Sequence, residues 1–268
     1  MIRRLWSSAS AHRGHTLLEM TIAVALGVVV VAGTVATYRS QRAAFVRAAD
    51  AARMRDAGIN ALVLIGDQIQ MAGFEPADRS GGTVAVTPGI FGCSAGRPAA
   101  LQQGFACTTP SSRSDGVALR YVGDGVSTWL STSGLVTDCL GQGSGPPGTV
   151  VANAFHARPG TSSGEPELYC EGSGNAGTAQ PLVQGVELLR LRYWLDGAVQ
   201  PLDASALTSA QWGDVAAVDL CVLVRGGTSV RPVRYVDCDG VPSVSEDGRM
   251  RQAFWRHVAI RNHNGAPP

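Results

Sequence analysis

The sequence predicts an α+β protein in which one long N-terminal helix packs under a β-rich C-terminal head. Three observations lead to this prediction. Residues 20–38 form a mostly apolar run without a formal charge, and residues 39–72 contain no proline and keep a helical spacing of apolar side chains. After Pro76 the apolar residues alternate with a period of two, as in strands. The chain has 268 residues, which is enough for one sizeable domain.

The apolar run from Met20 to Tyr38 is long enough to cross a membrane. As a helix it extends about 28 Å, close to the ~30 Å hydrocarbon core of a bilayer. Arg3, Arg4 and Arg13 precede it, with no acidic residue among them. By the positive-inside rule this predicts a cytoplasmic N-terminus, with the rest of the chain on the other side of the membrane.

Glu19 lies at the edge of this apolar run, where a carboxylate is costly in lipid and is usually functional. A secretory signal would have a shorter apolar core followed by a small-x-small cleavage site, whereas the run here is long and continues as a helix. A plain signal anchor fits the length and the charge. It leaves Glu19 unexplained.

The helix is expected to continue beyond the membrane and to run from about residue 16 to about residue 72. One helical face is predicted from apolar residues that recur at intervals of mostly three and four. These residues are Phe45, Ala49, Ala52, Ile59, Leu62, Ile65 and Ile69. Gly73 and then Pro76 give a stop signal. The arginines between residues 39 and 55 are interpreted as a solvated face of the helix.

Period-two alternation predicts strands in the head. The expected strands are 117–122, 189–195, 218–224 and 254–260. A short helix is expected at 204–211, capped by Asp203. Stretches rich in glycine, proline and serine predict loops. The expected loops are 141–148, 159–166 and 171–181.

The charge and the motifs indicate no nucleic-acid partner, no cofactor and no enzyme. The formal net charge is +1, and beyond residue 14 the chain has 19 basic and 21 acidic residues, which is not the composition of a nucleic-acid binder. The histidines of the head are His156, His257 and His263, and none lies in a GxSxG or HExxH motif. We therefore expect no catalytic residue.

The six cysteines predict disulfides. They are Cys93, Cys107, Cys139, Cys170, Cys221 and Cys238. Their number is even, all follow the N-terminal helix, and none forms the close CxxC pair that is common in zinc sites. Three disulfides in an oxidising compartment are the favoured interpretation. Among the possible connectivities we favour pairs of neighbours in sequence, namely Cys93–Cys107, Cys139–Cys170 and Cys221–Cys238.

One segment has part of the spacing of a calcium-binding loop. Asp237, Asp239 and Glu246 match its later ligand positions, but the first ligand position falls on Tyr235, which has no carboxylate. The preferred interpretation is a polar hairpin loop tied by Cys238. No metal site is expected.

The segment RGHTLLEMT at residues 13–21 resembles the class III signal of type IV pilins and pseudopilins. The resemblance implies that a prepilin peptidase cuts between Gly14 and His15 on the cytoplasmic side and leaves the apolar helix on the protein. His15 would then be the first mature residue and the candidate for N-methylation, at a position where the family commonly has Phe. Glu19 would be the fifth mature residue and would pair with the N-terminal amine of a neighbouring subunit.

Four further segments are similar to the PilW-like minor pilins. They are residues 51–73, 114–121, 181–196 and 247–262. The resemblance implies a pilin-like fold and a minor pilin of the type IV pilus, near the tip and active in pilus assembly. The implied partners are other minor pilins, the major pilin, the prepilin peptidase and the inner membrane, with a tip adhesin as a further candidate. Cell adhesion and twitching motility are the associated processes.

The expected organisation has three parts: a leader at 1–14, a long helix at 15–73 with a transmembrane part at about 17–38, and a periplasmic head at 74–268. The protein would first lie in the bacterial inner membrane and later in the pilus at the cell surface. Two alternatives stay open. One is a J-type minor pseudopilin of type II secretion, which shares the signal and a similar plan. The other is a membrane-anchored periplasmic enzyme or adhesin.

The cysteine pattern predicts three intramolecular disulfides in the exported protein. Mass spectrometry of unreduced peptides should recover three linked pairs and no alkylatable cysteine. Six alkylatable thiols in periplasmic material would contradict the prediction.

Overall fold

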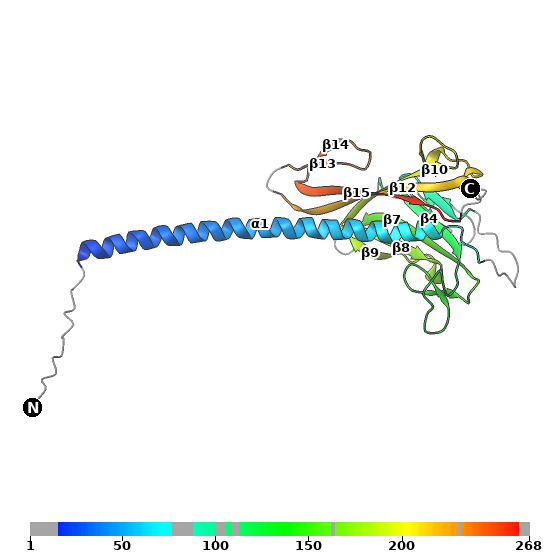
Figure 1. The fold of residues 1–268 in the computed structure, drawn as a ribbon, viewed down its shortest axis with the longest axis horizontal. Coiled ribbons are helices and arrows are strands. Elements are labelled where there is room, and N and C mark those ends of the chain that lie inside the picture. The colour runs from blue at the N-terminus through cyan, green and yellow to red at the C-terminus, as the bar shows by residue number, and fades with distance from the viewer. Residues whose placement is uncertain are drawn as a thin grey trace, which may run out of the picture. The chain divides into compact units, whose positions relative to one another are not determined.

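The computed structural model describes residues 16–76, 88–99, 106–108, 113–161, 164–229 and 232–262. The chain divides into two compact units, residues 1–49 and residues 50–268. One helix, α1 (Leu17–Met71), continues from the first unit into the second (Figure 1).

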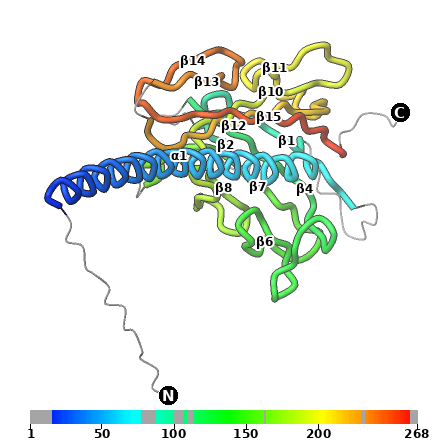
Figure 2. Tube along the Cα trace, turned by 60° about the vertical axis from the view of Figure 1, so that its left-hand side comes forward, coloured from blue at the N-terminus to red at the C-terminus, as the bar shows by residue number. Residues whose placement is uncertain are grey.

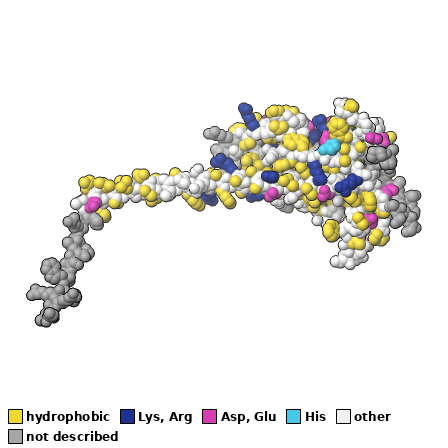
Figure 3. All heavy atoms as spheres, viewed as in Figure 1, with side chains coloured by type: hydrophobic (Ala, Val, Ile, Leu, Met, Phe, Trp, Pro, Cys, Tyr) yellow, Lys and Arg dark blue, Asp and Glu magenta, His cyan; other side chains and the backbone are white. Residues whose placement is uncertain are grey.

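The first unit consists of the N-terminal part of α1. Thr16 precedes the helix, and its Oγ1 accepts the backbone N–H of Glu19 at 3.3 Å. This N-cap satisfies one of the donors that the first turn leaves unpaired. By length and composition α1 can cross a membrane, and no residue of its most apolar 18-residue window is buried. Figure 3 shows hydrophobic side chains over much of this part of the helix.

The second unit, the head, contains two large antiparallel sheets. The strand orders are β1-β4-β7-β8-β9 and β11-β10-β12-β15. The first sheet comprises β1 (Ile90–Cys93), β4 (Gly116–Val122), β7 (Val150–Pro159), β8 (Pro166–Gly172) and β9 (Gln180–Gln184). The second comprises β10 (Val186–Leu195), β11 (Leu202–Asp203), β12 (Val215–Thr228) and β15 (Arg249–Ala259).

Short elements join these strands. Three small sheets pair β2 (Arg97–Ala99) with β3 (Ala106–Thr108), β5 (Val136–Thr137) with β6 (Gly143–Gly145), and β13 (Arg234–Val236) with β14 (Pro242–Val244). The 3₁₀ turns are η1 (Ser173–Asn175), η2 (Ala204–Ala206) and η3 (Gln211–Asp214). A long helix with a β-rich head is the α+β fold that the sequence predicts. Three of the expected strands lie within β4, β10 and β12, and the fourth, 254–260, coincides with the end of β15 and extends one residue beyond it.

The chain passes from one large sheet to the other at Gly185. This residue has φ of +88°, a conformation that glycine adopts without the steric cost of a Cβ atom. Its N–H donates to the carbonyl of Pro166 at 2.7 Å, and its own carbonyl accepts the N–H of Arg225 at 2.8 Å. Pro166 lies in β8 and Arg225 in β12, so a single residue is hydrogen-bonded to both sheets.

The C-terminal part of α1 belongs to the core of the head. Figures 1 and 2 show its cyan segment along the head, and Figure 2 shows β12 and β15 on one side of it and β7 and β8 on the other. The buried residues of the helix are Met54, Gly58, Ala61, Leu62, Ile65, Gly66 and Ile69. They share one cluster with apolar residues of both large sheets.

The helical face predicted from the sequence is only partly correct. Leu62, Ile65 and Ile69 are buried as expected. Ala52 and Ile59 are exposed. The buried face also includes Gly58 and Gly66, which the pattern of apolar side chains does not reveal because glycine has no side chain.

Gly58 and Gly66 lie where the helix and β15 approach most closely. A Cβ atom added at Gly58 would overlap the ring of Phe254, and one added at Gly66 would lie 2.5 Å from Nη1 of Arg256. The same Nη1 donates to the helix carbonyl of Leu62 at 3.2 Å. The absence of side chains at these two positions therefore lets β15 side chains pack directly on the helix backbone.

The helix ends against the first large sheet. Gly73 follows α1 with φ of +73°, the left-handed conformation that is typical of the residue after a helix. Its N–H donates to the carbonyl of Arg120 at 2.9 Å, and the N–H of Val122 donates to the carbonyl of Phe74 at 2.8 Å. Both hydrogen bonds tie the exit of α1 to β4.

The short helix predicted after Asp203 is wrong. Two 3₁₀ turns occupy this region, and the side chain of Asp203 makes no capping hydrogen bond. Asp203 is paired with Arg192 as part of β11, and the backbone at Leu207 is extended. The side chain of Gln211 accepts both the N–H and the hydroxyl of Thr208, which favours a tight turn at this point.

Gly58→Ala should lower the free energy of unfolding of the head by about 1–3 kcal/mol, because the new methyl group must displace Phe254 from a filled core. Gly33→Ala is the matched control, since no atom of the described residues outside the adjacent helix backbone lies within 4 Å of its added Cβ. Denaturant unfolding of the full chain in detergent, followed by tryptophan fluorescence, gives the comparison. Equal stability of the two variants would contradict the close packing at Gly58.

Candidate functional site

Glu19 is the candidate assembly residue, and it lies in the first turn of α1. A carboxylate there interacts favourably with the partial positive charge of the helix N-terminus. Gly14 and His15, the residues that flank the expected cleavage site, lie outside the described part of the chain. Cleavage and methylation therefore stay predictions.

In the apolar part of α1, threonine hydroxyls are hydrogen-bonded to the backbone of the helix itself. The hydroxyls of Thr21, Thr34 and Thr37 each donate to a helix carbonyl three or four residues earlier, at 2.8–2.9 Å. A hydroxyl that is bonded to its own helix avoids the cost of an unpaired donor in an apolar surrounding. The surface that remains is suited to lipid or to the apolar side of another helix.

Asp115 joins the two large sheets. Only 4% of the residue is exposed. Its Oδ1 accepts the N–H of Ala95 at 2.8 Å and Nη1 of Arg190 at 3.2 Å, and its Oδ2 accepts the N–H of Leu191 at 3.0 Å. Burial raises the pKa of Asp115, although these hydrogen bonds and the charge of Arg190 oppose the rise. Because both oxygens are held by the protein, the role of this carboxyl is structural.

Asn153 joins α1 to the first sheet. It is fully buried, and its Nδ2 donates to Oε1 of Gln68 at 2.7 Å. Its Oδ1 accepts the N–H of Cys139 at 2.9 Å. The side chain therefore connects the helix, β7 and the loop that carries a disulfide.

Three disulfides cross-link the head. They are Cys93–Cys107, Cys139–Cys170 and Cys221–Cys238, the three pairs that the sequence analysis favours. They connect β1 to β3, the loop after β5 to β8, and β12 to the turn of the β13–β14 hairpin. Each fixes a loop or a short strand to one of the large sheets.

The residues considered for calcium lie in and after the β13–β14 hairpin. Oδ1 of Asp237 accepts the N–H groups of Asp239 at 3.0 Å and Val241 at 2.8 Å, which closes the turn. Asp239 pairs with Arg192 at 3.3 Å, and Glu246 is exposed beyond β14. Within the part of the chain that the structure describes, no three His, Cys, Asp or Glu residues are grouped to hold a metal ion.

His156 is buried in β7, with 2% of the residue exposed, and neither ring nitrogen has a hydrogen-bond partner among the described residues. Burial, together with the charges of Arg97 and Arg158, lowers the pKa of His156 to about 3. The imidazole is therefore neutral at physiological pH. Its ring stacks on that of Tyr169, with centroids 5.7 Å apart, so it packs as part of the core.

His257 is exposed and lies beside Asp219. Its Nδ1 is 2.6 Å from Oδ1 of Asp219, and Oδ2 of the same carboxylate accepts Nε1–H of Trp194 at 2.7 Å. The register of β12 and β15 places Asp219 opposite His257. This pair was not predicted, because the alternation within each strand gives the face of a residue but not its partner across the sheet.

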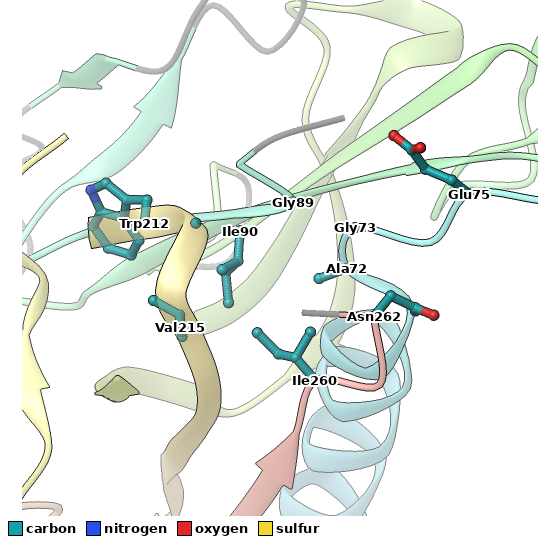
Figure 4. A pocket seen from close by; sticks show the side chains of 10 residues that line it. Ala72, Gly73, Glu75, Gly89, Ile90, Trp212, Val215, Ile260 and Asn262 are labelled. Carbon is teal, nitrogen blue, oxygen red and sulfur yellow. The ribbon is translucent and has the colours of Figure 1, made fainter. Parts of the chain in front are cut away.

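A pocket of about 240 Å³ lies where α1 ends. Ile90, Val215 and Ile260 supply apolar walls, and Figure 4 shows Glu75 and Trp212 on opposite sides. Among the described residues that line the pocket, Glu75 is the single titratable side chain.

Arg251 is the centre of an ion-pair network on β15. It donates from Nε and Nη2 to Glu187 at 2.7 and 2.9 Å, and from Nη1 and Nη2 to Asp247 at 2.7 and 2.9 Å. These hydrogen bonds raise the pKa of Arg251 and hold the pKa of Asp247 well below its usual range. The network links β10 and β15 to the turn after β14.

Comparison with known proteins identifies the family that this part of the chain resembles. The family model described as type IV pilus-assembly protein W, PilW, matches residues 156–262.

This region of the chain is PilW-like.

A solved type IV-like pilin from Thermus thermophilus is similar in structure, with a TM-score of 0.42 and 14% sequence identity over 79% of this chain and 95% of that chain. No curated protein matches the chain.

The PilW-like region contains the whole of the second large sheet, from β10 to β15. It also contains the Cys221–Cys238 disulfide and the Asp219–His257 pair. Two of the segments that resemble PilW-like minor pilins in sequence, 181–196 and 247–262, lie in it as β9–β10 and β15. The predicted resemblance to PilW-like pilins is confirmed over this region.

The ion pairs of the PilW-like region predict a dependence of stability on pH. Because the pKa of Asp247 is lower in the folded than in the unfolded protein, its contribution is complete above the unfolded pKa of about 4 and is lost as pH falls towards the folded pKa. Asp247→Asn should reduce Tm at neutral pH and flatten the fall in Tm between about pH 6 and about pH 2.

Glu246→Gln is the matched control. It removes an adjacent exposed carboxylate that takes part in no ion pair among the described residues. Thermal unfolding of the full chain in detergent across this pH range supplies the data. An unchanged pH dependence of Tm in Asp247→Asn would contradict the assigned role of the Asp247–Arg251 pair.

Proposed function

We propose that this chain is a minor pilin of the type IV pilus, with a structural role in pilus assembly. One observation carries the proposal: α1 is an exposed, apolar helix of membrane-spanning length at one end and a core element of the head at the other. A subunit of this kind can be anchored in the inner membrane and later be incorporated into a fibre without unfolding its head. The match of residues 156–262 to PilW favours the pilus over the type II secretion apparatus.

We further propose a position near the tip of the pilus, where the protein helps to initiate assembly. Its partners there would be other minor pilins and the major pilin. Before assembly the protein would be anchored in the inner membrane with its head in the periplasm, and the three disulfides suit that oxidising compartment.

The N-terminal segment supplies the assembly chemistry in this proposal. The prepilin peptidase cuts between Gly14 and His15, and the new amine of His15 is the candidate for methylation. A carboxylate at the end of an apolar helix is costly to bury without a partner. We assign Glu19 to pairing with the N-terminal amine of a neighbouring mature subunit, which offsets that cost only when the subunits are in register.

Glu19→Ala should leave membrane insertion intact, because it removes a charge from the apolar end of α1. Cleavage after Gly14 should also survive, whereas incorporation into pili should fail or fall sharply because the amine loses its carboxylate partner. The measurement is a blot for the precursor-to-mature shift beside quantification of the protein in sheared pili. Incorporation at the wild-type level would contradict the role assigned to Glu19.

Gly14→Val is the companion variant, because it acts on the leader rather than on the mature helix. It should block the cut, so that the precursor accumulates in the membrane. If Gly14→Val left the size of the protein unchanged, the proposal of a processed pilin would be wrong.

A further inference from the structure

The outer face of the second sheet, opposite α1, carries two rows of side chains that cross β10, β12 and β15. Phe254 and Arg256 point toward α1, so the alternate residues of β15 point away from it. The register places the side chains of each row opposite one another. The first row is Arg192, Asp219 and His257, and the second is Arg190, Cys221 and Trp255.

The β13–β14 hairpin forms a wall beside these rows. The Cys221–Cys238 disulfide ties its turn to the centre of the second row. Asp239, the next residue, pairs with Arg190 at 3.4 Å and with Arg192 at 3.3 Å. The sheet and the turn together line a half-open cavity of about 420 Å³, a size suited to a small ligand.

The polar groups of this cavity are held in fixed orientations. Asp219 accepts from Trp194 and binds Nδ1 of His257, so Nε2 of His257 points away from the carboxylate and has no partner among the described residues. Trp255 lies beside them and is 55% exposed. A flat aromatic surface and several preoriented hydrogen-bonding groups therefore line one cavity.

The charge of the cavity is balanced. Arg190 and Arg192 face two carboxylates, those of Asp219 and Asp239. Arg256 also lines the cavity, but its guanidinium donates to a carbonyl of α1 on the other face of the sheet. The carboxylates would repel a bound anion and the guanidiniums would repel a bound cation, so an uncharged ligand fits best.

We propose that this cavity binds a neutral saccharide. The apolar face of a sugar ring stacks on the indole of Trp255, as apolar groups pack on aromatic surfaces. The hydroxyls of the sugar donate to Asp219 and Asp239, accept from Arg192 and hydrogen-bond with Nε2 of His257, because a hydroxyl can serve both as a donor and as an acceptor. The proposal goes beyond the pilus-subunit function and does not depend on it.

The test uses the full chain, purified in a zwitterionic detergent whose head group is not a sugar. The protein is applied to an array of neutral oligosaccharides of hexoses and N-acetylhexosamines, beside their sialylated and uronic-acid counterparts. The strongest neutral binder is then titrated calorimetrically against wild type and variants. Trp255→Ala should weaken binding by about tenfold or more, since a buried aromatic contact is commonly worth this much.

Trp129→Ala is the matched control, because Trp129 is 91% exposed and does not line the cavity. It should bind as wild type does. Asp219→Asn keeps the shape of the cavity and should also weaken binding, which provides a second variant if Trp255→Ala is unstable. Wild-type binding confined to acidic glycans, no binding to any neutral glycan, or undiminished binding by Asp219→Asn and by folded Trp255→Ala would overturn the proposal.

Discussion

The rest of the structure depends on the contact between α1 and β15 at Gly58 and Gly66. Because these positions have no side chain, Phe254 and Arg256 lie directly on the helix backbone. The helix thereby becomes the surface on which the two sheets share one apolar core. Most of the stability of a helix in a protein comes from such packing rather than from intrinsic helix propensity. Glycine has a low helix propensity, and at these two positions the close packing outweighs that cost.

This contact explains how one helix can serve two surroundings. Its C-terminal part is fixed by the head, through the buried face and through the hydrogen bond between Gln68 and Asn153. Its N-terminal part exposes apolar side chains and keeps its threonine hydroxyls on its own backbone. The proposed pilin function follows from this division, because lipid and the interior of a fibre both accept an apolar helix while the disulfide-bonded head stays folded.

Much of this architecture could be predicted from the sequence, and the failures have physical causes. The long helix and strands β4, β10, β12 and β15 follow from their periodicity. Strands β7 and β8 were not identified, because nearly all of their residues are buried on both faces and therefore show no alternation. The buried face of α1 was partly misjudged, because glycines at 58 and 66 carry no apolar signal.

Which features of the sites can be predicted also depends on whether they are set by sequence order or by contacts between distant strands. The favoured disulfide pairs join cysteines 14, 31 and 17 residues apart, a local pattern that sequence order suggests. The Asp219–His257 pair and the cavity beside Trp255 depend on strand register and on the position of a hairpin, which sequence order does not give. Glu19 stands out from sequence alone, because a lone carboxylate beside an apolar run is conspicuous in any context.

The central claim is that the C-terminal part of α1 is a structural part of the head. Hydrogen–deuterium exchange of the full chain in detergent, resolved by peptide, tests it most directly. We expect the amides of residues 54–69 to exchange as slowly as those at the centre of β12, through the same cooperative opening of the head. Fast exchange of residues 54–69 while β12 stays protected would contradict the claim, because the helix would then open independently of the sheets.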